Sequence, residues 1–372
     1  MSDNETAGGA PVVNSAIAAL PPEIVALVRA MPVLDEPISR VNDAAAIVPP
    51  ARRWNEVPAE GHDGLFTQSW FPICLARDVA PGTLKGFDFL DGRVVVWRDG
   101  DGIAHVTSAF CPHMGASLEA GEVVDGTLRC AFHHWRYGPD GRCVVTAIGD
   151  TPPRNAALFV FPSVEKFGLI WAFNGETPLY TLPDFPHPTD ALLIKTIELP
   201  QLMPVDPWVQ CANTPDMQHI KTLHRVTFEQ GDPDDIIEWN PYDMQYDFKG
   251  RYDTGVQAEW RIGVFGTSLY YQSAEITGRW FGFLVPMGLP RPGFAKNFMT
   301  VAVQKTADTA GDREFLESCL LLEMAIVGED THIMSTMRFR PGTLTKSDRT
   351  LARYFQFLRA YPRAHPSRPF IT

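Results

Sequence analysis

The segment CPHMGASLEAGEVVDGTLRCAFHH, residues 111–134, constrains the chain more than any other feature of its sequence. In it Cys111 and His113 are followed by Cys130 and His133. Cysteine and histidine are scarce elsewhere, with 6 and 10 copies in 372 residues. Two cysteines, each with a histidine close behind, indicate a metal centre with mixed sulfur and nitrogen ligands.

Two kinds of metal centre are compatible with this ligand set. Zinc accepts two cysteines and two histidines, but a structural zinc site seldom has this spacing in glycine-containing β-loops. A [2Fe–2S] cluster agrees better, with two thiolates on one iron and two neutral imidazoles on the other, a substitution that raises the reduction potential. The remaining alternative is that the four residues are unrelated surface side chains.

Composition narrows the class of protein. The chain is 45% hydrophobic and 20% charged, as in globular proteins, and is long enough for two domains. Its net charge of −12 and lack of a basic run argue against a nucleic-acid partner. Six cysteines are too few for a disulfide scaffold. The acidic start, MSDNETAGGA, is unlike a signal peptide, and no apolar run is long enough for a membrane span, so we expect a cytoplasmic protein.

The pattern of apolar runs, turn residues and prolines divides the chain into three predicted regions. Residues 1–64 form an extension with a disordered start, a short helix after Pro21 and Pro22, and a Pro-rich linker at 49–61. Residues 65–175 are short β-like runs separated by turns, which predicts a small all-β domain with the Cys/His segment in its loops. Residues 176–372 mix strands and helices, which predicts an α+β domain with helices against an antiparallel sheet.

The second domain contains its own group of candidate ligands, in the segment NTPDMQHIKTLH. Asn213, Asp216, His219 and His224 lie there with Pro215. Two histidines and a carboxylate, with coordination positions left open, bind iron(II) in oxygen-activating enzymes. On an ideal helix His219 and His224 point about 140° apart, so both can face one metal only if the helix bends or bulges. The alternative is a helix with two buried, hydrogen-bonded histidines.

These segments resemble the Rieske non-haem iron oxygenases over residues 65–345, and most closely the oxygenase components of 3-ketosteroid 9α-hydroxylases and cholesterol-desaturase-like enzymes. The resemblance rests on HMG after the first ligands, FHHWRYGPDG around the second pair, and NTPDMQHIKTLH in the iron helix. One departure is His134, which stands where the family has glycine and is not assigned as a ligand. Cys143 lies outside the motif and is interpreted as a core residue.

The resemblance implies a Rieske domain followed by a helix-grip-like catalytic domain, with a metal centre in each. The [2Fe–2S] ligands would be Cys111, His113, Cys130 and His133. The mononuclear Fe(II) ligands would be His219, His224 and, from the downstream segment GEDTHIMSTM, Asp330, with Glu329 as the alternative.

The resemblance also implies how electrons move. In a head-to-tail homotrimer, His133 of one chain would face Asp216 of the next, and Asp216 would hydrogen-bond to His219. Asp216 and Asn213 are therefore expected to be catalytic residues. A reductase would deliver electrons from NAD(P)H, directly or through a ferredoxin.

The implied activity is that of a terminal oxygenase, which would use O2 to hydroxylate an apolar steroid-like, polycyclic or aromatic substrate. An aromatic O- or N-demethylase is the main alternative, ahead of a desaturase and a ring dioxygenase. A Rieske ferredoxin and a zinc-stabilised binding module are alternatives from other classes.

Aromatic residues on the candidate strands behind the iron would either line a substrate cavity or pack in the sheet core, because alternate residues of a strand face opposite sides. These residues are Trp260, Phe265, Tyr270, Trp280, Phe281 and Phe283.

Overall fold

The structure is a computed structural model, and it describes residues 21–30, 57–229, 235–253, 255, 257–276, 278–339 and 344–372. Residues 54–372 form one compact unit, and residues 1–53 belong to another. Helix α2 (Pro22–Ala30) forms at the position of the predicted short helix. The predicted disordered start, residues 1–14, lies outside the described residues.

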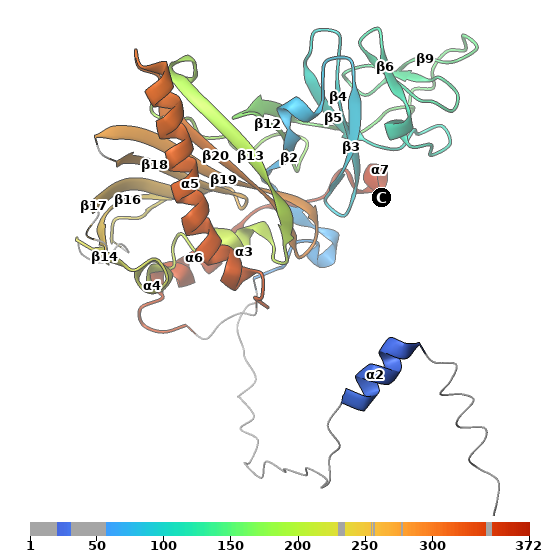
Figure 1. Ribbon diagram of the computed structural model, residues 1–372. Helices are drawn as coiled ribbons and strands as arrows, with labels where there is room; N and C mark the ends of the chain where they lie inside the picture. The colour runs from blue at the N-terminus through green and yellow to red at the C-terminus, as the bar shows by residue number, and fades with distance from the viewer. Residues whose placement is uncertain are drawn as a thin grey trace, which may run out of the picture. The chain divides into compact units, whose positions relative to one another are not determined.

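The first domain contains three small antiparallel sheets among its described residues (Figure 1). One has the strand order β10 (Val160–Phe161), β5 (Ala104–Ser108), β4 (Gly92–Arg98) and β3 (Leu84–Phe89). The next has the order β11 (Ser163–Lys166), β12 (Leu169–Phe173) and β2 (Trp70–Leu75). The third has the order β6 (Glu122–Val124), β7 (Thr127–Arg129), β8 (Arg136–Tyr137) and β9 (Cys143–Val145), and it carries the loops with the candidate cluster ligands.

The second domain is built on one eight-stranded antiparallel sheet, which confirms the predicted α+β class. Its strand order is β13 (Leu192–Met203), β20 (Phe294–Gln304), β19 (Arg279–Arg291), β18 (Leu269–Ile276), β17 (Gln257–Phe265), β16 (Asp243–Tyr252) and β14 (Val226–Phe228), and β15 (Glu238–Trp239) also pairs with β16.

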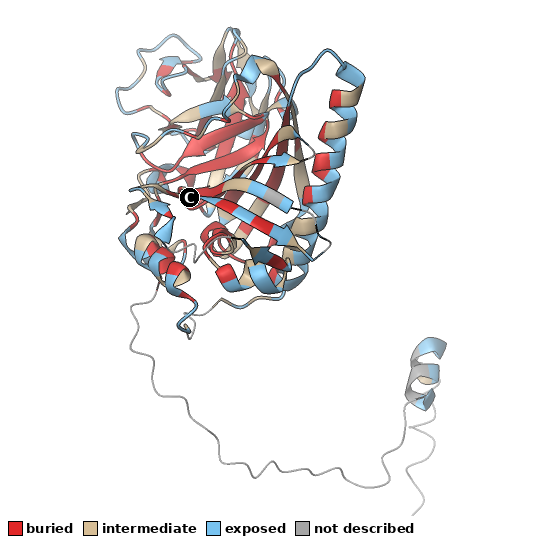
Figure 2. Ribbon diagram, turned by 90° about the vertical axis from the view of Figure 1, so that its left-hand side faces the viewer, coloured by how far each residue is buried: buried red, intermediate tan, exposed pale blue. Residues whose placement is uncertain are grey.

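Helices pack against this sheet. The long helix α5 (Thr309–Met334) crosses it, and α3 (Pro207–Cys211), α4 (Met217–Thr222) and α6 (Arg349–Ala360) gather near one end of α5 (Figure 1). Burial alternates around α5, whose outer side is largely exposed (Figure 2). The sheet and helices enclose the largest apolar core of the described chain. The candidate iron ligands line a cavity beside this core.

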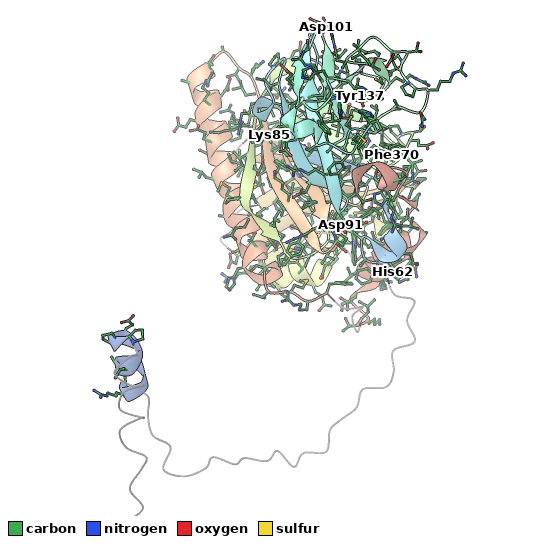
Figure 3. The ribbon with its side chains drawn as sticks, turned by 90° about the vertical axis from the view of Figure 1, so that its right-hand side faces the viewer. His62, Lys85, Asp91, Asp101, Tyr137 and Phe370 are labelled. Atoms are coloured by element: carbon green, nitrogen blue, oxygen red, sulfur yellow. The ribbon has the colours of Figure 1, made fainter. Side chains whose placement is uncertain are left out.

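The chain returns to the first domain after α6. Strand β21 (Arg363–Ala364) pairs with β1 (Phe66–Thr67), and the short helix α7 (Arg368–Ile371) follows. Ile371 is buried in the core of the first domain. The ring of Phe370, labelled in Figure 3, lies 5.7 Å from that of Phe159. The C-terminal part of the predicted 176–372 domain therefore packs within the first one.

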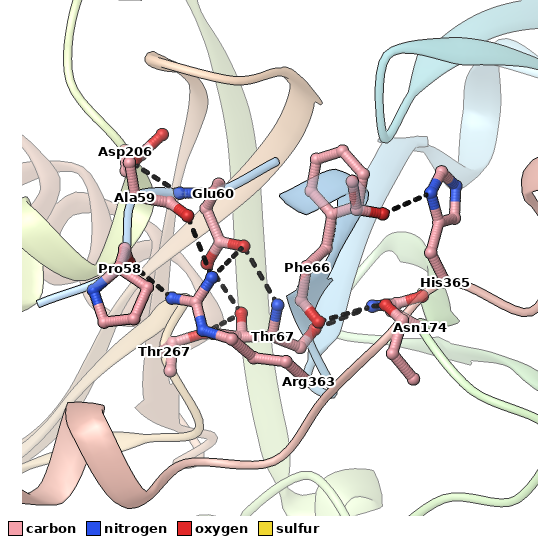
Figure 4. Close-up of polar contacts among 12 residues, drawn as sticks. Pro58, Ala59, Glu60, Phe66, Thr67, Asn174, Asp206, Thr267, Arg363 and His365 are labelled. Carbon is pink, nitrogen blue, oxygen red and sulfur yellow. Dashed lines mark hydrogen bonds and ion pairs between the residues drawn. The ribbon is translucent and has the colours of Figure 1, made fainter. Parts of the chain in front are cut away.

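A buried polar cluster around Glu60 joins the start of the folded unit to Asp206 and to Arg363 of β21 (Figure 4). The Glu60 carboxylate accepts hydrogen bonds from the backbone N–H and the hydroxyl of Thr67, at 2.9 and 2.7 Å. Arg363 approaches the same carboxylate at 3.9 Å, and the Glu60 N–H donates to Asp206 at 2.9 Å. Burial and the nearby charge of Asp206 outweigh the contacts with Arg363 and Thr67, and they raise the pKa of Glu60 to about 7. Residues 57–61, predicted as the end of a linker, are thus part of the folded unit.

Candidate active site and metal centres

The first pair of candidate ligands lies in a tight turn, and so does the second. The Gly115 N–H donates to the Cys111 carbonyl at 2.8 Å, and the His134 N–H donates to the Cys130 carbonyl at 3.0 Å. The residue that closes each turn has a left-handed backbone, with φ of 74° at Gly115 and 55° at His134. Glycine adopts this conformation without strain. His134 therefore stands at a position whose backbone favours glycine, which explains why glycine is the residue expected there.

The turns bring the side chains of like chemistry together. The rings of His113 and His133 have centroids 4.6 Å apart, and His113 stacks on Trp135 at 4.2 Å. Cys111 and Cys130 are buried free thiols. This arrangement, with two neighbouring imidazoles near the surface and two buried thiols without a disulfide, fits the mixed ligand set of a [2Fe–2S] cluster.

Tyr137 supports the buried side of this centre (Figure 3). Its hydroxyl oxygen lies 3.0 Å from the sulfur of Cys111. Burial raises the pKa of the Cys111 thiol, while the contact with Tyr137 favours the thiolate. Cys143 is buried in the same core and its thiol lies 3.4 Å from the Val145 carbonyl, in keeping with a core residue.

The second centre forms where a short helix stops. Helix α4 starts at Met217, after Pro215, and ends at Thr222. His219 lies in its middle, and His224 follows its end, just before Arg225 with φ of 55°. The helix therefore ends between the two histidines. That interruption lets both imidazoles turn toward one point, which an unbroken helix could not do.

Asp330 of α5 meets both histidines there. Its Oδ1 lies 2.8 Å from Nε2 of His219 and 3.4 Å from Nε2 of His224. One ligand atom from each of the three residues falls within 4.8 Å of the others. Glu329 contacts the other nitrogen of His224, Nδ1, at 3.0 Å. Asp330 is therefore the acidic residue that shares a candidate metal position with both histidines. Glu329 contacts the opposite nitrogen of His224 and can orient its ring.

The carboxylate of the triad is ionised, as a metal ligand must be. Burial disfavours the charge on Asp330, but hydrogen bonds from His219 and His224 lower its pKa to about 2. Burial likewise opposes the charge on His224, and its contacts with Asp330 and Glu329 raise its pKa. Two imidazoles and one ionised carboxylate converging on one point match the facial triad of non-haem iron sites.

The surroundings of His219 differ from the expectation in one respect. Its Nδ1 lies 3.3 Å from the carbonyl oxygen of Asn213, which can hold the ring with Nε2 toward the metal. The Asp216 carboxylate accepts instead from the backbone N–H of His219, at 3.0 Å, and so caps α4. Within the described part of the chain, no hydrogen bond joins Asp216 to the His219 imidazole.

The triad opens into a mainly apolar cavity between α5 and the sheet. Of the aromatic residues considered in the sequence, the cavity is lined by Trp260, Tyr270 and Phe283. The others pack in the core, namely Phe265, Trp280 and Phe281. Strand alternation explains Phe265 and Trp280, which have the opposite parity to the lining residues of their strands. Phe281 has the right parity but lies further along its strand.

The sequence analysis missed several polar residues of the cavity, among them Gln272 and Glu323. A signal for each was present. Gln272 is two residues from Tyr270 on the same strand face, and Glu323 precedes Asp330 by two helical turns. Both are buried.

Comparison with known protein families matches residues 69–159 to the Rieske [2Fe–2S] domain. This range contains both Cys/His turns. The chain carries a Rieske domain. The match confirms the predicted Rieske domain and the expected cluster type.

Curated relatives of the chain include Rieske oxygenases. Chlorophyllide a oxygenase (chloroplastic) of Chlamydomonas reinhardtii is 31% identical over 48% of this chain and 30% of its own length. The oxygenase component of 3-ketosteroid-9-alpha-monooxygenase of Rhodococcus rhodochrous is 31% identical over 36% of this chain and 33% of its own length. The matches thus cover about a third of each of these relatives.

A solved structure superimposes on most of the chain. The crystal structure of dicamba monooxygenase bound to dicamba superimposes with a TM-score of 0.61 at 19% identity, over 79% of this chain and 97% of that one. The likeness extends beyond the Rieske domain and confirms the predicted fold. None of the helices described for this chain is long and apolar enough to cross a membrane.

Proposed function

We propose that the chain is the terminal oxygenase of a multicomponent system that uses O2 and electrons from NAD(P)H to hydroxylate an apolar substrate. One observation supports this most directly. The candidate iron ligands His219, His224 and Asp330 converge at an apolar cavity, in a chain that also carries a Rieske domain. A ferredoxin needs no such second site, and a zinc-stabilised binding module needs no cavity beside it.

The residues divide the work between the two centres. His219, His224 and Asp330 would hold iron(II), while Cys111, Cys130, His113 and His133 would hold the cluster. When bound, these groups supply oxygen activation and single electrons, respectively. The Asn213 carbonyl orients His219, and Glu329 orients His224. Apolar side chains such as Trp260 and Phe283 position the substrate and exclude water.

The proposed assembly is a homotrimer, in which His133 of one subunit faces Asp216 of the next. Apolar side chains stand exposed beside the candidate cluster ligands, with Met114 at 68% and Phe132 at 62%. Such a patch is typical of a surface covered by a partner. The electron donor is proposed to be a reductase, acting directly or through a ferredoxin.

Mixing inactive subunits tests this assembly. Cys130→Ser removes the cluster and His219→Ala removes the iron, so each homo-oligomer should be inactive. If electrons cross between subunits, hetero-oligomers refolded or co-expressed from both variants regain activity. Hetero-oligomers that stay inactive would contradict transfer between subunits.

Oxygen labelling tests the activity. The protein is reconstituted anaerobically with iron and sulfide, and supplied with a surrogate reductase, NADH and 18O2. A panel of steroids, polycyclic hydrocarbons and substituted aromatics is then screened by mass spectrometry. We expect the parent protein to form a product that contains one 18O atom, and we expect His219→Ala to form no product. Formaldehyde from methoxy or N-methyl substrates would instead indicate a demethylase, and two 18O atoms a ring dioxygenase. Colourless reconstituted protein would contradict the Rieske cluster itself.

A further inference from the structure

Outside the metal triad, the polar lining of the cavity includes two hydrogen-bonded points. One is an amide pair, in which Gln210 and Asn297 donate to each other at 3.2 and 2.6 Å. The carbonyl oxygen of each amide in that pair therefore has a donor. The other point is Glu323, whose Oε1 accepts a hydrogen bond from Nε2 of Gln272 at 2.7 Å. Its Oε2 has no hydrogen bond from any other described residue, although the side chain is only 3% exposed and lines the cavity.

Glu323 differs from the other fully buried glutamate. Glu60 accepts two hydrogen bonds from Thr67 and lies near Arg363, so the scaffold occupies its carboxylate. Glu323 has one amide donor, and desolvation raises its pKa to about 7. A carboxylate can accept about four hydrogen bonds, and burying one with most of them unmade is costly. A donor arriving in the cavity would offset that cost.

The neighbours of Glu323 determine which kind of ligand it can bind. Tyr270 donates its hydroxyl to Oε1 of Gln272 at 2.7 Å, and Gln272 in turn donates its amide to Glu323. Burial and the nearby charge of Glu323 raise the pKa of Tyr270, so it stays a hydroxyl donor. The Tyr270 hydroxyl thus donates to Gln272, and the Gln272 amide donates to Oε1 of Glu323. Oε2 of Glu323 remains as a hydrogen-bond acceptor for a ligand in the cavity.

The helix places this acceptor at a defined distance from the triad. Glu323 and Asp330 lie two turns apart on α5 and share a face, separated by about 10 Å along the axis. Ile326 and Val327 line the cavity between them. The cavity therefore has metal ligands at one point, apolar surface in the middle and a carboxylate beyond it.

We propose that Glu323, oriented by Gln272 and Tyr270, binds a hydroxyl or N–H group of the substrate at the part of the cavity remote from the triad. This inference rests on the proposed function and specifies its substrate class. The substrate is an elongated apolar molecule that carries a hydrogen-bond donor about two helical turns from the position that faces the triad. Alcohols are therefore bound in preference to the corresponding ketones or methyl ethers.

Equilibrium binding tests the inference without turnover. The probes are 5α-androstan-3β-ol, 5α-androstan-3-one and the methyl ether of the alcohol. Calorimetry at pH 8 keeps the carboxylate ionised in the reconstituted protein. We expect the parent protein to bind the alcohol about tenfold more tightly than the other two, as a hydrogen bond to a charged group would give.

Substitutions at Glu323 separate this role from simple packing. Glu323→Leu should abolish the preference for the alcohol. Glu323→Gln should reverse it in favour of the ketone, because its oxygen still accepts from Gln272 and its NH2 group then faces the cavity. Glu314→Gln, an exposed position of the same helix, is the matched control and should change nothing. Intact cluster absorption and far-UV circular dichroism show that each variant has folded.

The outcomes distinguish this inference from the proposed function. Equal binding of alcohol and ketone by the parent protein would overturn the role of Glu323 alone. So would an unchanged preference in folded Glu323→Gln. If Glu323 variants do not fold, Tyr270→Phe provides the second test, since loss of the Gln272 contact should weaken the preference, and a full preference would overturn the inference. If none of the three probes binds, both this inference and the steroid-like substrate class fail.

Discussion

The Asp216 carboxylate accepts a hydrogen bond from the backbone N–H of His219 at 3.0 Å, and so caps the helix that carries a proposed iron ligand. Within one chain this contact is structural. The proposed role of Asp216 in electron transfer requires a second contact, with His133 of a neighbouring subunit. A substitution that keeps the cap and removes the charge can separate the two roles.

Asp216→Asn is that substitution, since asparagine caps a helix as well as aspartate does. We expect the variant to keep both metal centres, accept electrons at the cluster and turn over substrate at a small fraction of the parent rate. Stopped-flow absorption should show a cluster that stays reduced when substrate and O2 are added. Asp216→Ala, the control, should lose in addition about 1 kcal/mol of stability. Rapid reoxidation of Asp216→Asn coupled to product would leave Asp216 only a structural role.

Removing a triad ligand should affect one metal centre alone. We expect His219→Ala and Asp330→Ala to lose the mononuclear iron while the visible absorption of the cluster persists. Glu329→Gln should retain iron, but bind it about tenfold more weakly, because Glu329 contacts the far nitrogen of His224. Metal analysis with anaerobic iron titration measures all three. An equal loss of cluster iron would contradict separate sites, and full loss in Glu329→Gln would favour Glu329 as the ligand.

The cluster assignment predicts different results for two buried cysteines. Cys130→Ser should abolish the cluster absorption and its electron paramagnetic resonance signal, because a serine hydroxyl does not replace the thiolate. Cys143→Ser should retain both, since this thiol lies near the Val145 carbonyl within the core. A normal signal in Cys130→Ser would rule out the assignment of Cys130.

The left-handed backbone at His134 predicts an order of stability among variants. His134→Gly should be more stable than His134→Ala by about 1 kcal/mol, because alanine is strained at φ of 55° and glycine is not. Urea unfolding of the two variants measures the difference. Both should keep the cluster spectrum of the parent protein, whereas loss of the signal in both would make His134 a ligand.

The buried carboxyl of Glu60 should make stability depend on pH. Burial raises its pKa from 4.5 to about 7, so the folded protein binds this proton more tightly than the unfolded chain. The contribution of this bound proton to the free energy of unfolding is complete below about pH 4.5 and is lost as the pH rises through 7. In Glu60→Gln the side chain resembles the protonated carboxyl but does not titrate, so its contribution to stability does not change with pH, whereas that of Glu60 does. We therefore expect it to be more destabilising at pH 5 than at pH 8, by on the order of 2–3 kcal/mol. An equal effect at both pH values would contradict the raised pKa.

Local motifs made the metal centres predictable. Cys111 and His113 occupy one turn, and Cys130 and His133 another, so their spacing in sequence reflects their placement in space. The interruption between His219 and His224 followed from helix geometry alone, because two side chains five positions apart on an unbroken helix cannot both point to one metal. Choosing Asp330 over Glu329 required the family resemblance. The two are adjacent, and only the tertiary structure shows which reaches both histidines.

The sequence could not predict which point along a strand lies beside the cavity and which lies in the core. Parity separates Trp260 from Phe265, but it cannot separate Phe283, in the cavity, from Phe281, in the core, because both face the same side. Their difference arises from what packs opposite each point of β19. Glu323 was hidden for a similar reason, since a glutamate on a long helix is usually solvent-exposed.

The pairing of β1 with β21 has a consequence for biosynthesis. Asn174 donates to the carbonyl of Ala364, 190 positions further along the chain, and Ile371 completes the core of the Rieske domain. As the polypeptide leaves the ribosome, the cluster-binding loops emerge long before β21, the strand that pairs with β1. The Rieske domain cannot reach its final packing until the catalytic domain has been translated. Its maturation is thereby coupled to that of the catalytic domain, which limits the time that a finished cluster could exist without the site it serves.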